Sequence, residues 1–247
     1  MISIKSQEEI EKIRSAGKIL AEVAKILRKN VKVGVTTQYL DDLAEKEFKR
    51  KDVISAFKGY RGYPKNICAS INEEVVHGIP DERKLAEGDI LSLDLGVKLG
   101  KYFADMAFTE PVGKIDSCKK KLISVTREAL RLAIKQVRPG NRIHDISHAV
   151  QSYVESQSFS VVREFVGHGI GTELHEEPQI PNFGKSGTGE LIKEGMVFAI
   201  EPMVNVGVWQ VDILDNGWTA VTVDRKPSCH FEHTIVALSN GPCVLTE

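Results

Sequence analysis

Apolar residues recur at helical spacing in the N-terminal part of the chain and then give way to alternation. Ser6 and Glu9 form a capping box before a run of apolar positions that predicts a helix to about Lys29. A second amphipathic stretch follows Thr37, a candidate helix cap. Between residues 52 and 112 the pattern becomes strand-like alternation interrupted by Gly and Pro turns, which predicts strands.

The same order of elements returns later in the chain. A helical face starts near residue 117 and ends at Pro139-Gly140, and another helical face follows from Ile143. Strand-like segments then continue to the last residues. The sequence therefore predicts the order helix, Gly turn, helix, strands twice.

Two short matches relate the two regions. The segment 31–34 recurs as 137–140, at an offset of 106 residues, and the segment 87–94 recurs as 194–201, at an offset of 107. One such match is compatible with chance similarity between ordinary strand starts. Two matches at nearly the same offset, with the same element order, favour an internal duplication.

The duplication has a consequence for two acidic residues. It makes Asp94 and Glu201 equivalent positions, both expected at strand ends near an axis of pseudo-symmetry. We expect one domain, residues 1–247, made of repeats of about 1–115 and 116–247 that pack their sheets together.

Composition narrows the class of protein. Of 247 residues, 42% are hydrophobic and 27% are charged, which excludes a disordered or fibrous chain. The net charge of −1 gives no global basic field for nucleic acid or a membrane surface, and the apolar runs are too short to span a bilayer. The 4 cysteines are scattered without a C-x-x-C pair, which is typical of reduced thiols in a cytoplasmic protein.

A hairpin in the first half carries two acids that need an explanation. Asp94 lies in a strictly alternating strand, and Leu99-Gly100 is typical of a hairpin tip. A turn centred there makes Asp94 and Asp105 direct cross-strand partners. Such like charges destabilise a sheet unless a shared proton, a basic partner or a metal ion offsets them. The alternative is an exposed edge hairpin with both acids in water.

The second half contains two further acids in strand settings. Glu201 ends an apolar run, and Glu232 shares a strand face with Thr234, whereas the adjacent His233 points the other way and is interpreted as structural. Four acids at one locus carry a charge of about −4, which two divalent cations would neutralise. Oxygen-rich donors with one imidazole suit Mn²⁺, Fe²⁺ or Co²⁺, with Zn²⁺ as a further candidate.

Three of the 7 histidines are candidates for that imidazole and for catalysis. His168 lies in a GHGIG segment, where glycines leave room for a ligand to approach the backbone. His175 opens a HEEP segment, and His77 opens a related HGIP segment. Lone histidines are usually structural, but three in such settings favour a functional role.

Short motifs follow one another through nearly the whole chain. In order they are GYxGYP (59–64), HGIP (77–80), Asp94 with Asp105, GHGIG (167–171), HEEP (175–178), IEPM (200–203) and FEHT (231–234). This ordered set resembles the type I methionine aminopeptidase family. The resemblance implies an α+β pita-bread fold, in which two pseudo-symmetric helix-helix-strand halves with antiparallel sheets surround a central dinuclear metal site.

The resemblance also implies a mechanism. Asp94, Asp105, His168, Glu201 and Glu232 would bind two divalent metal ions (Co, Mn, Fe or Zn), with Asp105 and Glu232 bridging them. A bridging hydroxide would attack the first peptide bond of chains that begin with methionine and have a small second residue. Glu201 would also shuttle the proton.

Other residues gain roles by the same resemblance. His175 would stabilise the tetrahedral intermediate, and His77 would hold the substrate backbone. A narrow apolar methionine pocket would be walled by Tyr60, Tyr63, Cys68, Phe165 and Trp218, whose alternative interpretation is ordinary core packing. The chain departs from the family pattern at Phe57, usually a small residue, and at Leu174, usually an aromatic one.

The implied partners are nascent polypeptide N-termini and, transiently, the ribosome, with the protein expected to be a cytoplasmic monomer. Two rival functions stay open at this point. A proline-directed aminopeptidase of the same fold would carry an extra N-terminal domain, which this sequence does not show ahead of its first helix. A metal-free binding protein that kept the scaffold would be expected to have lost ligands, and every ligand position here is filled.

Overall fold

The N-terminal helices form where the sequence predicts them. In a computed structural model that describes residues 2–247, helix α1 (Gln7–Asn30) starts at the capping box, where the Glu9 N–H donates to the Ser6 hydroxyl over 3.3 Å. Helix α2 (Thr37–Arg50) is capped by Thr36 and not by Thr37. The Thr37 hydroxyl is instead buried and donates to the Asp81 carbonyl over 3.0 Å, so it is not free to cap the helix.

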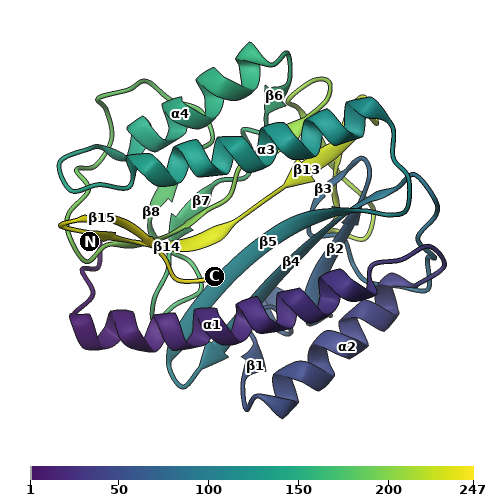
Figure 1. Cartoon of the computed structure of the whole chain (residues 1–247), viewed down its shortest axis with the longest axis horizontal. Coiled ribbons are helices and arrows are strands. Elements are labelled where there is room, and N and C mark those ends of the chain that lie inside the picture. The colour runs from purple at the N-terminus through teal and green to yellow at the C-terminus, as the bar shows by residue number, and fades with distance from the viewer. Residues whose placement is uncertain (1) are drawn as a thin grey trace.

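A second helix pair follows in the other half of the chain. Helix α3 (Ser117–Gln136) and helix α4 (Ile143–Ser156) pack against each other. In the view of Figure 1, α1 and α2 lie below and α3 and α4 above, with β5 and β14 between the two pairs. One hydrophobic cluster runs between the two pairs, from Leu20 on α1 to Leu130 on α3.

The strands between the helix pairs are all antiparallel to their neighbours. Those of the first half are β1 (Ile54–Ser55), β2 (Ile67–Ile71), β3 (Glu74–Val76), β4 (Ile90–Leu99) and β5 (Tyr102–Pro111). Those of the second half are β6 (Ser160–Val161), β7 (Gly167–Gly169), β8 (Glu176–Ile180), β9 (Val197–Ile200), β10 (Met203–Asn205), β11 (Val211–Ile213), β12 (Ala220–Thr222), β13 (Ser228–His230), β14 (His233–Leu238) and β15 (Gly241–Val244).

Two larger sheets carry most of the strand area. One has the order β1-β4-β2 with β5 paired to β4, and the other has the order β15-β14-β9-β7-β8. Smaller sheets join β13-β10-β6 and β11-β12-β3. A short 3₁₀ turn, Tyr60–Gly62, lies between β1 and β2.

The predicted register of the β4–β5 hairpin is wrong by two residues. Leu99 pairs with Tyr102, so the turn is Gly100-Lys101, and Asp105 faces Gly96 while Asp94 faces Ala107. The two acids are therefore diagonal neighbours rather than direct partners. A shift of two residues keeps both on the same face, because side chains alternate with period two.

The predicted position of Asp94 at a strand end is also wrong. Asp94 lies in the middle of β4, whereas Glu201 directly follows the last residue of β9. Hydrogen bonding within the extended hairpin carries β4 several residues beyond its equivalent in the second half.

A short seam joins the two halves between β5 and the segment leading into β14, which lie side by side in Figure 1. At its centre the Glu232 N–H donates to the Ala107 carbonyl over 2.9 Å. On one side of that bond the Thr234 hydroxyl accepts from the Asp105 N–H over 3.0 Å and donates to the Asp105 carbonyl over 2.8 Å. The seam thus fixes Asp105 and Glu232 as diagonal neighbours across it.

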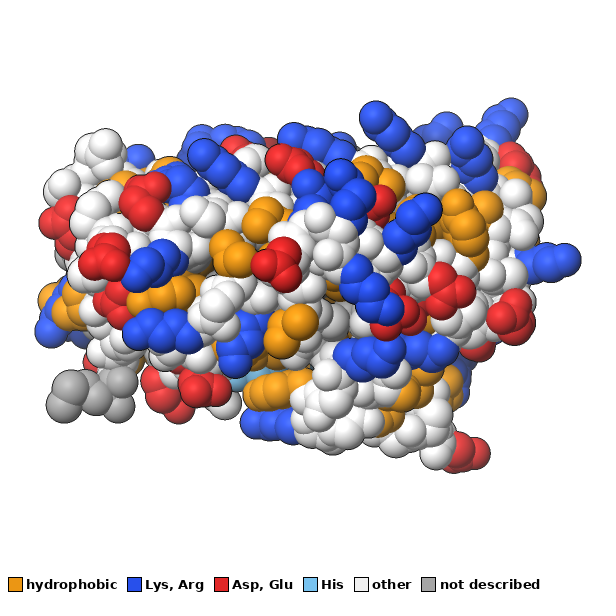
Figure 2. All heavy atoms as spheres, turned by 90° about the horizontal axis from the view of Figure 1, so that it is seen from below, with side chains coloured by type: hydrophobic (Ala, Val, Ile, Leu, Met, Phe, Trp, Pro, Cys, Tyr) orange, Lys and Arg blue, Asp and Glu red, His pale blue; other side chains and the backbone are white. Residues whose placement is uncertain are grey.

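The outer surface carries mixed charge. On the face shown in Figure 2, which lies on the side of α1 and α2, Lys and Arg side chains are interspersed with Asp and Glu. Among residues 2–247, no helix is both long enough and apolar enough to cross a bilayer.

Candidate metal and substrate site

A cavity of about 330 Å³ opens where the two halves meet. Its walls include every residue that the sequence singled out as a site residue, from both halves of the chain. These are Tyr60, Tyr63, Cys68, His77, Asp94, Asp105, Phe165, His168, His175, Glu201, Trp218 and Glu232. The structure therefore brings together, around one cavity, residues that are far apart in the sequence.

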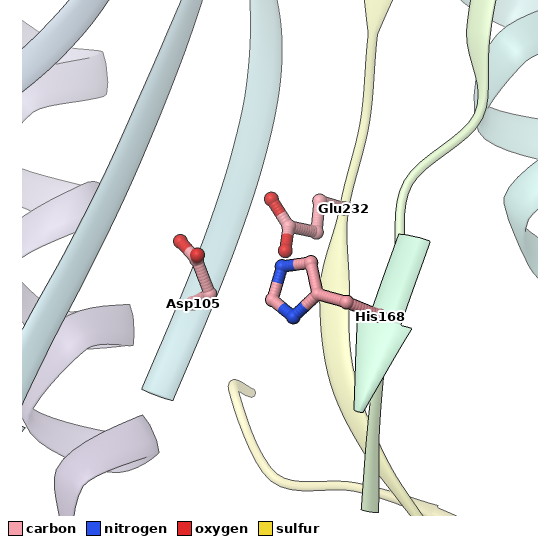
Figure 3. A group of neighbouring side chains, drawn as sticks. All are labelled: Asp105, His168 and Glu232. Carbon is pink, nitrogen blue, oxygen red and sulfur yellow. The ribbon is translucent and has the colours of Figure 1, made fainter. Parts of the chain in front are cut away.

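The acidic end of the cavity has the arrangement of a cation site. Ligand atoms of Asp105, His168 and Glu232 all lie within 4.8 Å of one another, and all three residues are buried. Figure 3 shows the three side chains converging from β5, from β7 and from the segment before β14. Carboxylate oxygens with one imidazole nitrogen match the preferences of divalent first-row metals.

The carboxylates of this cluster are not satisfied by the protein. Among the described residues, Asp94 Oδ1, Asp105 Oδ1 and Glu232 Oε1 are buried without a hydrogen-bond partner. Burial raises the pKa of Asp105 and of Glu232 well above the usual value, and repulsion from neighbouring carboxylates raises each further. Burial likewise raises the pKa of Asp94. A bound cation would supply the missing partner and offset this cost.

His168 offers a free nitrogen to the same point. Its Nδ1 lies 2.9 Å from the Gly169 carbonyl, which can only accept, so Nδ1 carries the proton. Nε2 is then unprotonated, yet it lies 3.5 Å from Glu201 Oε1. Two electron-rich atoms facing each other repel, and a cation bound to both would turn this contact into an attraction. Burial lowers the pKa of His168 to about 4, so the ring is neutral at physiological pH.

The backbone around His168 tolerates only glycine at the next position. A Cβ added at Gly169 would lie 2.2 Å from the Glu177 carbonyl oxygen on the neighbouring strand β8. The glycine therefore lets β7 and β8 approach closely enough to hold His168 over the cavity.

The other two predicted histidines lie farther along the cavity. His175 Nδ1 is 2.8 Å from the Tyr60 hydroxyl, and partial desolvation at the cavity wall lowers the pKa of its ring to about 3. His77 has a left-handed backbone (φ 60°) and packs its ring edge-on against Phe165, with centroids 5.3 Å apart. Burial lowers the pKa of His77 to about 4, so both rings are neutral near pH 7.

The rest of the cavity wall is apolar and aromatic. Tyr63 meets Trp218 edge-on, with centroids 5.1 Å apart, and its hydroxyl donates toward the Gly78 carbonyl over 3.0 Å. Cys68 is buried on β2 beside them. Phe57 and Leu174, which both depart from the family pattern, also line the cavity.

Sequence reasoning missed His230. It is 1% exposed, and its Nε2, which has no hydrogen-bond partner within residues 2–247, lies 3.9 Å from Glu201 Oε2. Burial lowers the pKa of His230 to about 3. The available signal was its spacing, because a residue two positions before Glu232 lies on the same side of an extended chain.

Known proteins resemble this chain along its whole length. Residues 11–238 match metallopeptidase family M24. Methionine aminopeptidase 1 of Bacillus subtilis is 50% identical over 246 residues, covering 100% of this chain and 99% of the relative. The methionine aminopeptidase of Clostridium acetobutylicum is also 50% identical, over 247 residues, with 100% and 99% covered.

Solved structures agree in fold. The crystal structure of methionine aminopeptidase from Thermotoga maritima matches with a TM-score of 0.98 and 49% identity, covering 100% of both chains. The prolidase from Pyrococcus horikoshii matches with a TM-score of 0.80 at 21% identity, covering 99% of this chain and 63% of that one, a likeness of fold alone. The α+β pita-bread fold expected from the sequence motifs is thereby confirmed.

Proposed function

Because this chain belongs to metallopeptidase family M24, within which it is a methionine aminopeptidase, we propose that its cavity holds an N-terminal methionine beside two divalent metal ions. The reaction is hydrolysis of the first peptide bond of polypeptides whose second residue is small. The observation that carries the proposal is the set of buried carboxylate oxygens without protein partners around His168.

The five predicted ligands suit this role. Asp94, Asp105, His168, Glu201 and Glu232 would hold the ions, and all five line the cavity where the two halves meet. Divalent ions held there would make a water molecule more acidic and would polarise a carbonyl oxygen. The ions would be Co, Mn, Fe or Zn, which accept carboxylate and imidazole ligands.

The chain's own residues supply the remaining chemistry. Glu201, whose pKa is raised by burial and by the charge of Asp94, is suited to take up a proton and deliver it to the leaving amine. His175, held by Tyr60, would donate a hydrogen bond to the oxygen of the reacting carbonyl. His77 would hold the substrate backbone at the scissile amide.

The apolar end of the cavity would receive the methionine side chain. Tyr60, Tyr63, Cys68, Phe165 and Trp218 form its walls. Thioether sulfur makes favourable contacts with aromatic ring edges, which favours methionine over branched side chains. The free amino group of the substrate would be held at the opposite, acidic end of the cavity, near Asp94. Only the first peptide bond would then reach the catalytic residues.

The substrates are nascent polypeptide N-termini, and we propose that the protein meets them transiently at the ribosome, as a cytoplasmic monomer. The free thiols found at all four cysteines of the described chain suit such a compartment. We further propose that residues 1–247 act as one catalytic domain whose halves, about 1–115 and 116–247, are duplicated, since each contributes acids to the cavity.

A peptide panel tests the function. Chelator-stripped protein receives Mn²⁺, Fe²⁺, Co²⁺ or Zn²⁺ singly and is assayed with Met-Ala-Ser, Leu-Ala-Ser and Ala-Pro peptides. We expect cleavage of Met-Ala-Ser only after a metal is restored, and none after Glu201→Gln, a variant that should keep the fold. Cleavage without metal, or preference for the proline peptide, would contradict the proposal.

The rival functions are less well supported. A prolidase and an Xaa-Pro dipeptidase share the fold at 21% and 20% identity, whereas methionine aminopeptidases reach 50%. A metal-free binding protein would have no reason to keep three buried carboxylates without partners among the described residues, since each destabilises the fold.

A further inference from the structure

His230 is a buried histidine beside Glu201 to which the proposed function gives no role. Its Nε2 is aimed at Glu201 Oε2 from 3.9 Å and has no hydrogen-bond partner in residues 2–247. We propose that His230 is a positioning residue that donates a hydrogen bond to Glu201 and thereby orients this carboxylate for metal binding. This inference rests on the proposed function, because it concerns a ligand of the proposed metal centre.

The backbone of His230 is held rigidly. Its N–H donates to the Thr109 hydroxyl over 3.1 Å, and the same hydroxyl donates to the His230 carbonyl over 2.8 Å. On the other side, His230 pairs with Met203 on β10, two residues after Glu201. The backbone that carries the ring is therefore fixed both to β5 and to the strand that follows Glu201, so we expect the Glu201 carboxylate to make the larger adjustment.

Glu201 needs such a donor. Among the described residues, no side-chain hydrogen bond holds its carboxylate, and His168 cannot donate to it because the His168 proton is on Nδ1, facing Gly169. The two imidazoles lie on opposite oxygens: His168 faces Oε1 and His230 faces Oε2. A donor on Oε2 leaves Oε1, beside the free His168 nitrogen, as the oxygen for the cation.

The distance also fits a carboxylate that moves on metal binding. A hydrogen bond between nitrogen and oxygen spans about 2.7–3.2 Å, so Glu201 must shift toward His230 by about 1 Å to form it. A rotation that draws Oε2 toward His230 carries the carboxylate into one defined orientation. Groups behind a ligand that orient it in this way typically change metal affinity 10–100-fold when removed.

Metal binding measured by calorimetry tests this role without relying on activity. Chelator-stripped wild type, His230→Gln and His230→Phe are titrated with Mn²⁺. We expect His230→Phe to raise the Mn²⁺ dissociation constant about tenfold. His230→Gln retains an N–H donor, and its dissociation constant should stay within about threefold of the wild-type value. His230→Leu serves as a second apolar variant if the Phe ring does not fit, and circular dichroism verifies the fold of each.

A double-mutant cycle separates positioning from direct coordination. In a Glu201→Ala background, His230→Phe should leave the Mn²⁺ affinity unchanged, because the group on which His230 acts is gone. A further loss in that background would make His230 a ligand itself and overturn the proposal.

His233→Phe tests whether any histidine replacement in this region changes Mn²⁺ affinity through packing alone. His233 is the neighbouring histidine, but its Nδ1 contacts the Thr246 hydroxyl over 2.8 Å, away from the cavity. His233→Phe should leave the Mn²⁺ affinity unchanged even if it lowers the melting temperature. Wild-type affinity in both His230→Phe and His230→Leu would overturn the role of His230 alone, whereas wild-type protein that binds no divalent metal would overturn the proposed function.

Discussion

The proton on His175 can serve catalysis only if it is on the correct nitrogen. To donate to the oxygen of the reacting carbonyl, His175 must carry its proton on Nε2, and the Tyr60 hydroxyl then donates to Nδ1 over 2.8 Å. Tyr60→Phe removes this donor and frees the other tautomer. For Tyr60→Phe we expect kcat for Met-Ala-Ser to fall roughly tenfold with little change in KM. We expect His175→Ala to lower kcat about 10²–10³-fold.

The matched control for this prediction is Tyr39→Phe. Tyr39 is an exposed tyrosine on α2, and the change removes a hydroxyl far from the cavity. It should leave kcat unchanged in the same steady-state assay. A Tyr60→Phe enzyme as fast as wild type would show that the hydrogen bond does not select the tautomer.

His77 should make the fold sensitive to acid. Burial lowers its pKa in the folded protein to about 4 from 6.5, so the unfolded chain binds the proton more tightly. Its contribution to the free energy of unfolding is complete above pH 6.5 and is lost as the pH falls toward 4. The free energy of unfolding should therefore fall less between pH 7 and pH 4 in His77→Asn than in wild type, by roughly 2–3 kcal/mol.

Urea unfolding at both pH values, with chelator present throughout, measures the effect. Asn tolerates the left-handed backbone at this position, which keeps strain out of the comparison. The other buried histidines still titrate in the variant, so only the slope with pH changes. An unaltered slope would mean that His77 is already solvated in the folded protein.

At the scale of single residues, motif reasoning located side chains well but not their partners. It found Asp105, His168 and Glu232, because acids in apolar strands and glycine-flanked histidines are unusual. It could not find the bond between Tyr60 and His175, which joins positions 115 residues apart. His230 was missed because its neighbourhood depends on how β13 meets β10.

At the scale of elements, one hydroxyl makes two of the hydrogen bonds across the seam between β5 and β14. Thr234 accepts from the Asp105 N–H and donates to the Asp105 carbonyl, and both groups are buried. Thr234→Val keeps the shape but leaves both groups unpaired. We expect the free energy of unfolding to fall by about 1–3 kcal/mol and Mn²⁺ affinity to weaken, because Asp105 is no longer fixed.

Thr234→Ser keeps the hydroxyl and serves as the comparison. Thermal unfolding and calorimetric Mn²⁺ titration of the two variants should therefore differ, with the serine variant close to wild type. If both variants lose the same stability and affinity, the effect belongs to packing of the methyl group and not to the hydrogen bonds.

The elements themselves were largely predictable, and their register was not. The capping box at Ser6 and the apolar periodicity define α1 almost to the residue. The β4–β5 turn fell at Gly100-Lys101 rather than Leu99-Gly100, because either pair satisfies the local preferences for a turn. The hairpin selects the register through contacts of its whole length, which local sequence does not contain.

At the scale of the molecule, the cavity depends on two halves that each contribute charge. Asp94 and Asp105 come from the first half, and Glu201 and Glu232 from the second. Because like charges repel, the halves close around these acids only at a cost in stability. The repeats in the sequence predicted this convergence, but not the threonine contacts that secure the seam.

Bound metal should offset the repulsion among the four acids. Saturating metal should stabilise the whole molecule, because the folded state alone gathers the ligands: at a free Mn²⁺ concentration one hundred times the dissociation constant, the gain is about 2.7 kcal/mol. For a chain of this size that corresponds to a rise in melting temperature of about 5–10 °C over the chelated protein. Scanning calorimetry with and without chelator measures it.

Asp105→Asn separates the destabilisation of the metal-free fold by its buried acids from the stabilisation by bound metal. The amide removes a buried acid whose pKa is raised by burial and by Asp94, so at pH 8 the metal-free variant should melt above metal-free wild type. The same variant should lose most of the stabilisation by Mn²⁺, because one of the proposed carboxylate ligands is gone. The contrary result is a metal-free variant with a lower melting temperature than metal-free wild type and the same rise in melting temperature with Mn²⁺. It would show that Asp105 neither destabilises the metal-free fold nor contributes to metal binding.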